Sequence, residues 1–205
     1  MSGDGTKIFY RTTGNVLKTA ASTTPVNATQ LTTGVRGMLG MSADEKYVMA
    51  YSNAPDTANT NFPRIDLQLA SLSAAGALTP LLAASTGLPV GFTSTNSHAV
   101  YTTDLPASGP PVGALKAKPV AGGAEVVIAQ KAVLPRLVKA TAKVAYADNL
   151  QQVGQGVAVD INVADLAAGA TPKLVIDAVD VSYDLDDKNI YYTVAGQGLF
   201  YKAIP

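Results

Sequence analysis

Apolar and polar residues alternate along short stretches of the chain, and Gly, Asp, Asn and Ser gather between those stretches. The clearest alternation lies at 65–72, Ile-Asp-Leu-Gln-Leu-Ala-Ser-Leu, and another lies at 157–163, Val-Ala-Val-Asp-Ile-Asn-Val. Strict alternation is typical of a strand with one buried face. No window of a dozen residues has a capped 3.6-residue apolar stripe, and Gly76 and Pro80 interrupt the Ala-rich stretch 69–84. The pattern therefore predicts an all-β protein.

A polar turn followed by a β-branched and aromatic run recurs five times along the chain. The first two copies read Ser-Gly-Asp-Gly-Thr-Lys-Ile-Phe-Tyr at 2–10 and Ser-Ala-Asp-Glu-Lys-Tyr-Val-Met-Ala-Tyr at 42–51. Short polar side chains and Gly favour tight turns, so each turn with its two flanking runs predicts a β-hairpin, and two more strand-like runs follow it. The residues that take the same place in the five copies, at separations of 40, 52, 44 and 46 residues, are Ile8, Val48, Val100, Val144 and Ile190.

Four strands in about 45 residues form the unit of a β-propeller blade. We therefore expect residues 1–205 to form a single propeller domain of about four to five four-stranded blades. If the polar turn joins the first and second strands, the chain contains eighteen strands, the first copy lacks its first strand and the last copy lacks its fourth. This predicts an incomplete ring, either a fragment of a longer ring or a piece that another chain completes. Its open strand edges favour self-association.

The copies at 2–10 and 42–48 resemble the TolB-like, WD-like propeller repeat, whose hallmark is Ser-Pro-Asp-Gly, two residues, and then Ile-Ala-Phe or Ile-Tyr-Tyr. The Pro of that motif is absent from both copies, and the third and fourth copies have lost the Asp. The resemblance implies the propeller fold. Members of this broad family are similar to one another as periplasmic scaffolds, lid domains of peptidases and cell-surface binding modules. The resemblance thus implies a periplasmic or extracellular setting and no single activity.

Composition narrows the range of partners. Fifteen basic and fifteen acidic residues cancel, so the chain lacks the positive surface that nucleic-acid binding requires. The sequence contains 0 cysteines, which excludes disulfides and thiolate-based metal or catalytic sites. No run of about 18 apolar residues occurs, so we expect no membrane insertion. We also expect no cofactor, and a protein or peptide as the partner.

Candidate catalytic residues are scattered. His98 is the single histidine and falls in a polar turn, where we expect a solvated surface residue. The acidic stretch 184–189 has alternating oxygens that suit Ca²⁺, but it lacks the Gly and terminal Glu of a twelve-residue calcium loop, which favours a hairpin turn. The carboxylates that remain for glycoside hydrolysis, with no spacing that brings two together, are Asp66, Asp104, Asp160 and Asp165. We therefore expect no enzyme activity.

The two longest loops, 52–63 and 103–112, both connect a second strand to a third strand, so they should lie on one rim. The candidate binding residues on and beside them are Asn53, Asp56, Asn59, Asn61, Arg64, Asp104 and Ser108. We expect a non-catalytic binding or scaffolding module for a protein, peptide or glycan, in a bacterial envelope or extracellular protein. Two alternatives stay open: a substrate-gating propeller attached to a hydrolase domain outside this chain, and a hydrolase or lyase with Asp-based chemistry in the channel.

Overall fold

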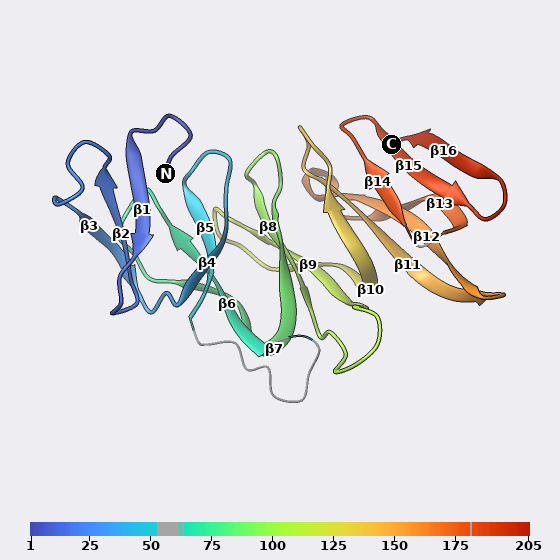
Figure 1. Cartoon of the computed structure of the whole chain (residues 1–205), viewed down its shortest axis with the longest axis horizontal. Helices are drawn as coiled ribbons and strands as arrows, with labels where there is room; N and C mark the ends of the chain where they lie inside the picture. The colour runs from blue at the N-terminus through green and yellow to red at the C-terminus, as the bar shows by residue number, and fades with distance from the viewer. Residues whose placement is uncertain (53–61, 63, 181) are drawn as a thin grey trace.

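The computed structural model describes residues 1–52, 62, 64–180 and 182–205, and these form antiparallel strands with one 3₁₀ turn, η1 (Leu166–Ala168) (Figure 1). In this part of the chain, no helix has the length and apolarity needed to span a bilayer. The strands, in chain order, are β1 (Lys7–Arg11), β2 (Val16–Ala21), β3 (Thr29–Thr33), β4 (Gly37–Met41), β5 (Tyr47–Tyr51), β6 (Arg64–Ser71), β7 (Thr79–Phe92), β8 (His98–Thr103), β9 (Gly113–Pro119), β10 (Val126–Leu137), β11 (Lys143–Val153), β12 (Gly156–Asp165), β13 (Pro172–Asp180), β14 (Tyr183–Leu185), β15 (Asn189–Val194) and β16 (Gly198–Ala203).

The strands pair into five units that we name blades A to E. Blade A contains β1, β2 and β3, and blade E contains β14, β15 and β16. Between them, β7 and β10 are each shared by two blades: β7 pairs with β6 through 79–86 and with β8 through 87–92, and β10 pairs with β9 and then with β11. Blades B, C and D therefore have four strands each, and the described chain carries the predicted eighteen strand segments, three in each end blade.

The five blades lie side by side in a row that is not closed into a ring (Figure 1). The turns between first and second strands follow the upper rim of the view, and the described connections between second and third strands follow the opposite rim. Blade A lacks a first strand and blade E lacks a fourth. The fold is an all-β, open propeller, as the sequence predicts.

Four apolar clusters form the core, one between each pair of neighbouring blades. In the A–B cluster, Leu17 of β2 lies with Val48 and Ala50 of β5, and in the D–E cluster, Ile161 of β12 lies with Ile190 of β15. The B–C and C–D clusters follow the same rule. Because successive residues of a strand point to opposite faces, each internal blade buries one face against the preceding blade and the other against the following one.

In the third repeat, the anchor residue lies one position earlier than the alignment of the five copies predicts. The backbone N of Thr93 donates to the carbonyl of His98, as the N of Ser42 donates to Tyr47, so Ala99 takes the place equivalent to Val48. Val100 lies one residue later and packs on the opposite face, in the C–D cluster. A one-residue shift exchanges the two faces of a strand, and the β-branched Val resembles the other anchors more than Ala does.

Candidate functional site

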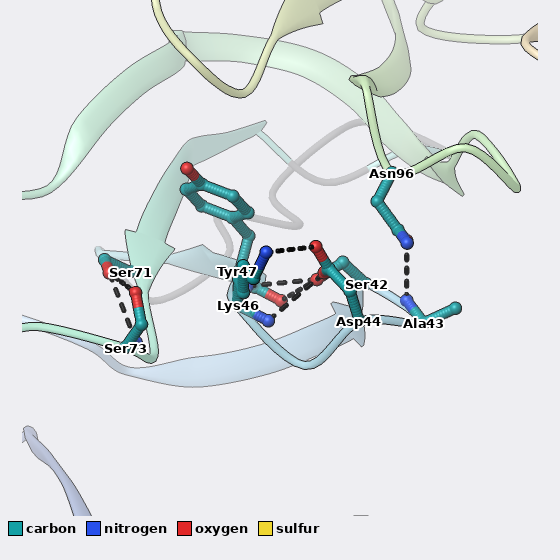
Figure 2. A network of polar contacts seen from close by, with 8 residues as sticks. All are labelled: Ser42, Ala43, Asp44, Lys46, Tyr47, Ser71, Ser73 and Asn96. Atoms are coloured by element: carbon teal, nitrogen blue, oxygen red, sulfur yellow. Dashed lines mark hydrogen bonds and ion pairs between the residues drawn. The ribbon is translucent and has the colours of Figure 1, made fainter.

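The polar turns that define the repeat are built by internal hydrogen bonds. Ser42 Oγ donates to Asp44 Oδ1 (2.7 Å) and accepts from the backbone N of Tyr47 (3.0 Å) (Figure 2). The turn of blade A repeats this arrangement, and the hydrogen bond from Ser2 Oγ is the main cause that lowers the pKa of Asp4 to about 2. The Ser-x-Asp signature is thus explained by turn geometry and needs no ligand.

These turns also bond to one another along the rim. The backbone N of Gly3 donates to Glu45 in the next turn, and the backbone N of Ala43 donates to Asn96 Oδ1 (2.8 Å) in the turn after that (Figure 2). These hydrogen bonds link blade A to blade B and blade B to blade C, so the rim that carries the repeat signature has a structural role.

The acidic stretch at 184–189 contains the hairpin turn between β14 and β15. The carboxylate of Asp186 accepts from the backbone N of Lys188 (2.7 Å) and of Asn189 (2.6 Å), and from the hydroxyl of Tyr191 (2.7 Å). These bonds lower the pKa of Asp186 to about 2, with the bond from Lys188 as the largest cause. The carboxylate thereby closes the hairpin between β14 and β15.

His98 departs from the solvated residue that the sequence predicts. It is half-buried at the start of β8, and its Nδ1 lies 2.9 Å from Ser97 Oγ. Burial lowers the pKa of the imidazole, because it disfavours the charged form. The contact with Ser97 therefore connects the imidazole to the turn that precedes β8.

The opposite rim carries the predicted binding residues that the structure describes. Arg64 at the start of β6, and Asp104 and Ser108 in the β8–β9 loop, are all exposed. The same loop is fixed to blade B by Leu105, whose carbonyl accepts from Thr86 Oγ1 (2.6 Å). The other four predicted residues, Asn53, Asp56, Asn59 and Asn61, lie outside the described residues.

A feature that the sequence analysis missed is an exposed apolar surface on the first strands of the blades. We call it the first-strand wall and define it as β4, 87–92 of β7, 133–137 of β10, and β14. Its most exposed large apolar residues are Met38, Leu39, Met41, Leu88 and Leu134. The sequence signal is the short apolar run before each turn. In these runs the side chains on both faces of the strand are apolar, and not those on one face alone. Contiguous exposed apolar surface of this kind marks interaction sites.

Two adjoining cavities follow the first-strand wall across blades C, D and E, and together we call them the wall groove. The first has a volume of about 300 Å³ and is lined by Leu88, Pro89, Val90, Thr102, Leu105, Pro111, Leu134 and Pro135. The second has a volume of about 330 Å³ and is lined by Val90, Pro135, Arg136, Leu137, Asp184 and Leu185. Two lining residues from the β8–β9 loop, Leu105 and Pro111, connect the groove to the predicted binding rim.

The groove combines one strained residue with one ion pair. Leu134 has a φ of 50°, in the left-handed region that costs an L-residue about 1–2 kcal/mol. Its carbonyl accepts from the hydroxyl of Tyr183 (2.7 Å), and burial raises the pKa of that hydroxyl. Arg136 Nη1 lies 3.5 Å from Asp184 Oδ1, so both signs of charge are present at the blade E end of the groove. Backbone strain of this kind clusters at functional sites.

Two carboxylates lie close together in blade D, although their spacing in the sequence did not predict it. Asp148 of β11 lies directly opposite Asp160 of β12, and burial followed by the charge of Asp160 raises the pKa of Asp148. Side-chain amides bond to both: Asn162 donates to Asp148 (2.9 Å) and Asn149 donates to Asp160 (2.8 Å). Neither carboxylate is among the described residues that line the wall groove.

Comparisons with known proteins support the fold. No protein-family profile matches the sequence, and no curated protein matches it. Among solved structures, the chain is similar to a eukaryotic initiation factor, with a TM-score of 0.56 and 11% identity over 98% of this chain and 50% of that one. It is also similar to the tricorn protease, with a TM-score of 0.52 and 12% identity over 92% of this chain and 19% of that one.

TolB from Acinetobacter baumannii aligns with 98% of this chain and 52% of its own, at a TM-score of 0.43 and 13% identity. This chain thus spans about half, or less, of each of these three solved structures. Likeness at such identities concerns the fold alone. The chain is a β-propeller module.

Proposed function

We propose that this chain is a non-catalytic binding module that holds an extended, apolar peptide segment of a protein partner. The observation that carries the proposal is the wall groove: an apolar cavity between blades C and D, lined in part by Leu105 and Pro111 of the β8–β9 loop, adjoins a more polar one between blades D and E. Ligand sites are typically concave, mostly apolar and fitted with few polar groups. The Arg136–Asp184 pair at one end supplies charges that orient a peptide.

The lining of the groove favours a peptide over a glycan. The eight described residues that line the first, apolar cavity are Leu, Pro, Val and Thr, with no aromatic ring for a sugar to stack on. In addition, β4 and β14 each have one paired neighbour within the described residues, so the other edge of each offers free backbone groups. An extended peptide binds to such an edge by adding a strand.

A periplasmic or extracellular setting belongs to the same proposal and rests on the TolB-like repeat motif at 2–10 and 42–48. A second candidate function is substrate gating for an attached hydrolase. The likeness to 19% of the tricorn protease chain favours it, although that likeness concerns the fold. The same groove would then hold a peptide substrate on its way to a separate catalytic domain.

Selection of random twelve-residue peptides displayed on phage tests the proposal. We expect the wild-type chain to enrich a shared apolar, Pro-containing consensus that Leu134→Asn no longer binds, because Asn tolerates the left-handed φ but removes the apolar contact. The control is Leu174→Asn, at an exposed residue of the outermost strand β13 that lies outside the groove. Absence of any consensus, or equal binding by Leu134→Asn, would contradict the proposal.

A further inference from the structure

The outer face of blade E exposes a residue position that every other blade buries. On each third strand, one apolar residue lies opposite the fifth residue of the second strand; in blades A to E these residues are Leu17, Leu67, Leu115, Ile161 and Leu199. The first four are 0% exposed, whereas Leu199 is 71% exposed. Tyr201, two residues further along β16, is 71% exposed as well, and its ring lies 6.3 Å from that of Tyr191.

Each internal interface shows what normally covers this position. Leu17 lies in one cluster with Val48 and Ala50, which are the second and fourth residues of the second strand of the next blade. Leu67, Leu115 and Ile161 are covered in the same way by blades C, D and E. One contact rule thus repeats four times along the row.

Blade A presents the matching half of this contact on its outer face. The second and fourth residues of β1 are Ile8 and Tyr10. Because Phe9 between them packs toward blade B, Ile8 and Tyr10 point away from it, and both are partly exposed. Their equivalents in blade D, Val144 and Tyr146, are buried against blade C.

We propose that the outer face of blade E docks on the outer face of blade A of a second copy of this chain, head to tail. Leu199 and Tyr201 on one side meet Ile8 and Tyr10 on the other, which continues the contact rule of the four internal interfaces. A stacked unit needs a neighbour when its outer face is apolar, and the outer face of blade E exposes Leu199 and Tyr201. Because the two surfaces differ, the contact closes into a ring or continues as a filament.

The mass of the chain in solution tests this proposal by light scattering after size exclusion, over a range of concentrations. We expect a mass above the 21.0 kDa of one chain that rises with concentration. Leu199→Asp and Ile8→Asp should each weaken association at least about tenfold, because a charge in an apolar interface loses its hydration. The control Leu174→Asp changes a residue of similar exposure, 60%, on the outermost strand β13, and should associate as the wild type does.

Mixing the two interface variants separates a head-to-tail contact from other forms of association. Each variant alone retains one intact face, so it should remain a monomer. The mixture of the two variants should form a 1:1 complex with twice the mass of the monomer. Tyr201→Asp replaces Leu199→Asp if circular dichroism shows that the latter is unfolded. A wild-type chain that stays single at every concentration would overturn the proposal. Continued dimerisation of Ile8→Asp alone would do so too, because it indicates contact between two copies of blade E.

Discussion

At the residue scale, the first-strand wall contains two leucines with equal exposure and different backbones. Leu88 and Leu134 are each 39% exposed and line the same cavity, but Leu134 alone has a positive φ. Glycine adopts that conformation without steric cost. We therefore expect Leu134→Gly to cost less free energy of unfolding than Leu88→Gly, by about 1 kcal/mol. Urea unfolding of the two variants measures the difference, and an equal loss would show that Leu134 carries no backbone strain.

The carboxylate pair in blade D gives a prediction about pH. The pKa of Asp148 is raised in the folded chain, so its charged form opposes folding above the ordinary pKa range of Asp, and the penalty disappears as pH falls below that range. Asp148→Asn should accordingly be more stable than the wild type at pH 7, because Asn keeps an acceptor for Asn162 and removes the charge.

Urea midpoints of Asp148→Asn and the wild type between pH 7 and pH 4 check this prediction. The advantage of the variant should shrink steadily as the pH is lowered. An advantage that is constant with pH, or a variant less stable than the wild type at pH 7, would assign the Asp148 carboxylate a stabilising role instead.

At the scale of elements, the polar turn is the unit that the repeat preserves. Ser42 is almost fully buried and its Oγ serves both Asp44 and the backbone N of Tyr47. We expect Ser42→Ala to lower the free energy of unfolding by about 1–2 kcal/mol, because a buried donor loses its partner. Ser73→Ala is the control, since Ser73 is exposed and its Oγ contacts Ser71 (Figure 2). Equal thermal midpoints for the two variants would contradict this role.

The strands could be predicted because their signals are local. Alternation at 65–72 and 157–163 became β6 and β12, and the polar residues near Asp4 and Asp44 became the tight turns that precede β1 and β5. The one-residue displacement at Val100 shows where local signals fail. The register of this strand depends on the hydrogen bond from the backbone N of Thr93, and the turn that begins at Thr93 has no Ser-x-Asp motif to mark it.

The wall groove could not be predicted, because it depends on neighbours from three blades. Leu88, Leu134 and Leu185 are separated by about 50 residues each along the chain, as repeat units of propellers are, and meet only when the blades stack. An apolar run before a turn predicts a strand, but exposure of its side chains depends on what stands opposite. The cross-strand partner of Asp160 was missed for a different reason: Asp148 lies in the same blade, but the pair is set by the register between β11 and β12 and not by spacing along the chain.

At the scale of the whole molecule, a row of stacked units gains stability from each unit and from each interface between neighbours. Blades B, C and D have two interfaces each, whereas blades A and E have one. Leu115 in blade C and Leu199 in blade E therefore form a matched pair, with the same residue type at the same structural position and opposite burial.

We expect Leu115→Ala to lower the free energy of unfolding by about 2–5 kcal/mol, because it leaves a cavity in the C–D cluster. Leu199→Ala should cost less than about 0.5 kcal/mol in the dilute chain, since it truncates an exposed side chain. Urea unfolding at low and high protein concentration distinguishes the two. If a second copy covers blade E, the cost of Leu199→Ala grows with concentration while that of Leu115→Ala does not. A large cost for Leu199→Ala at the lowest concentration would mean that this face is already buried within a single chain.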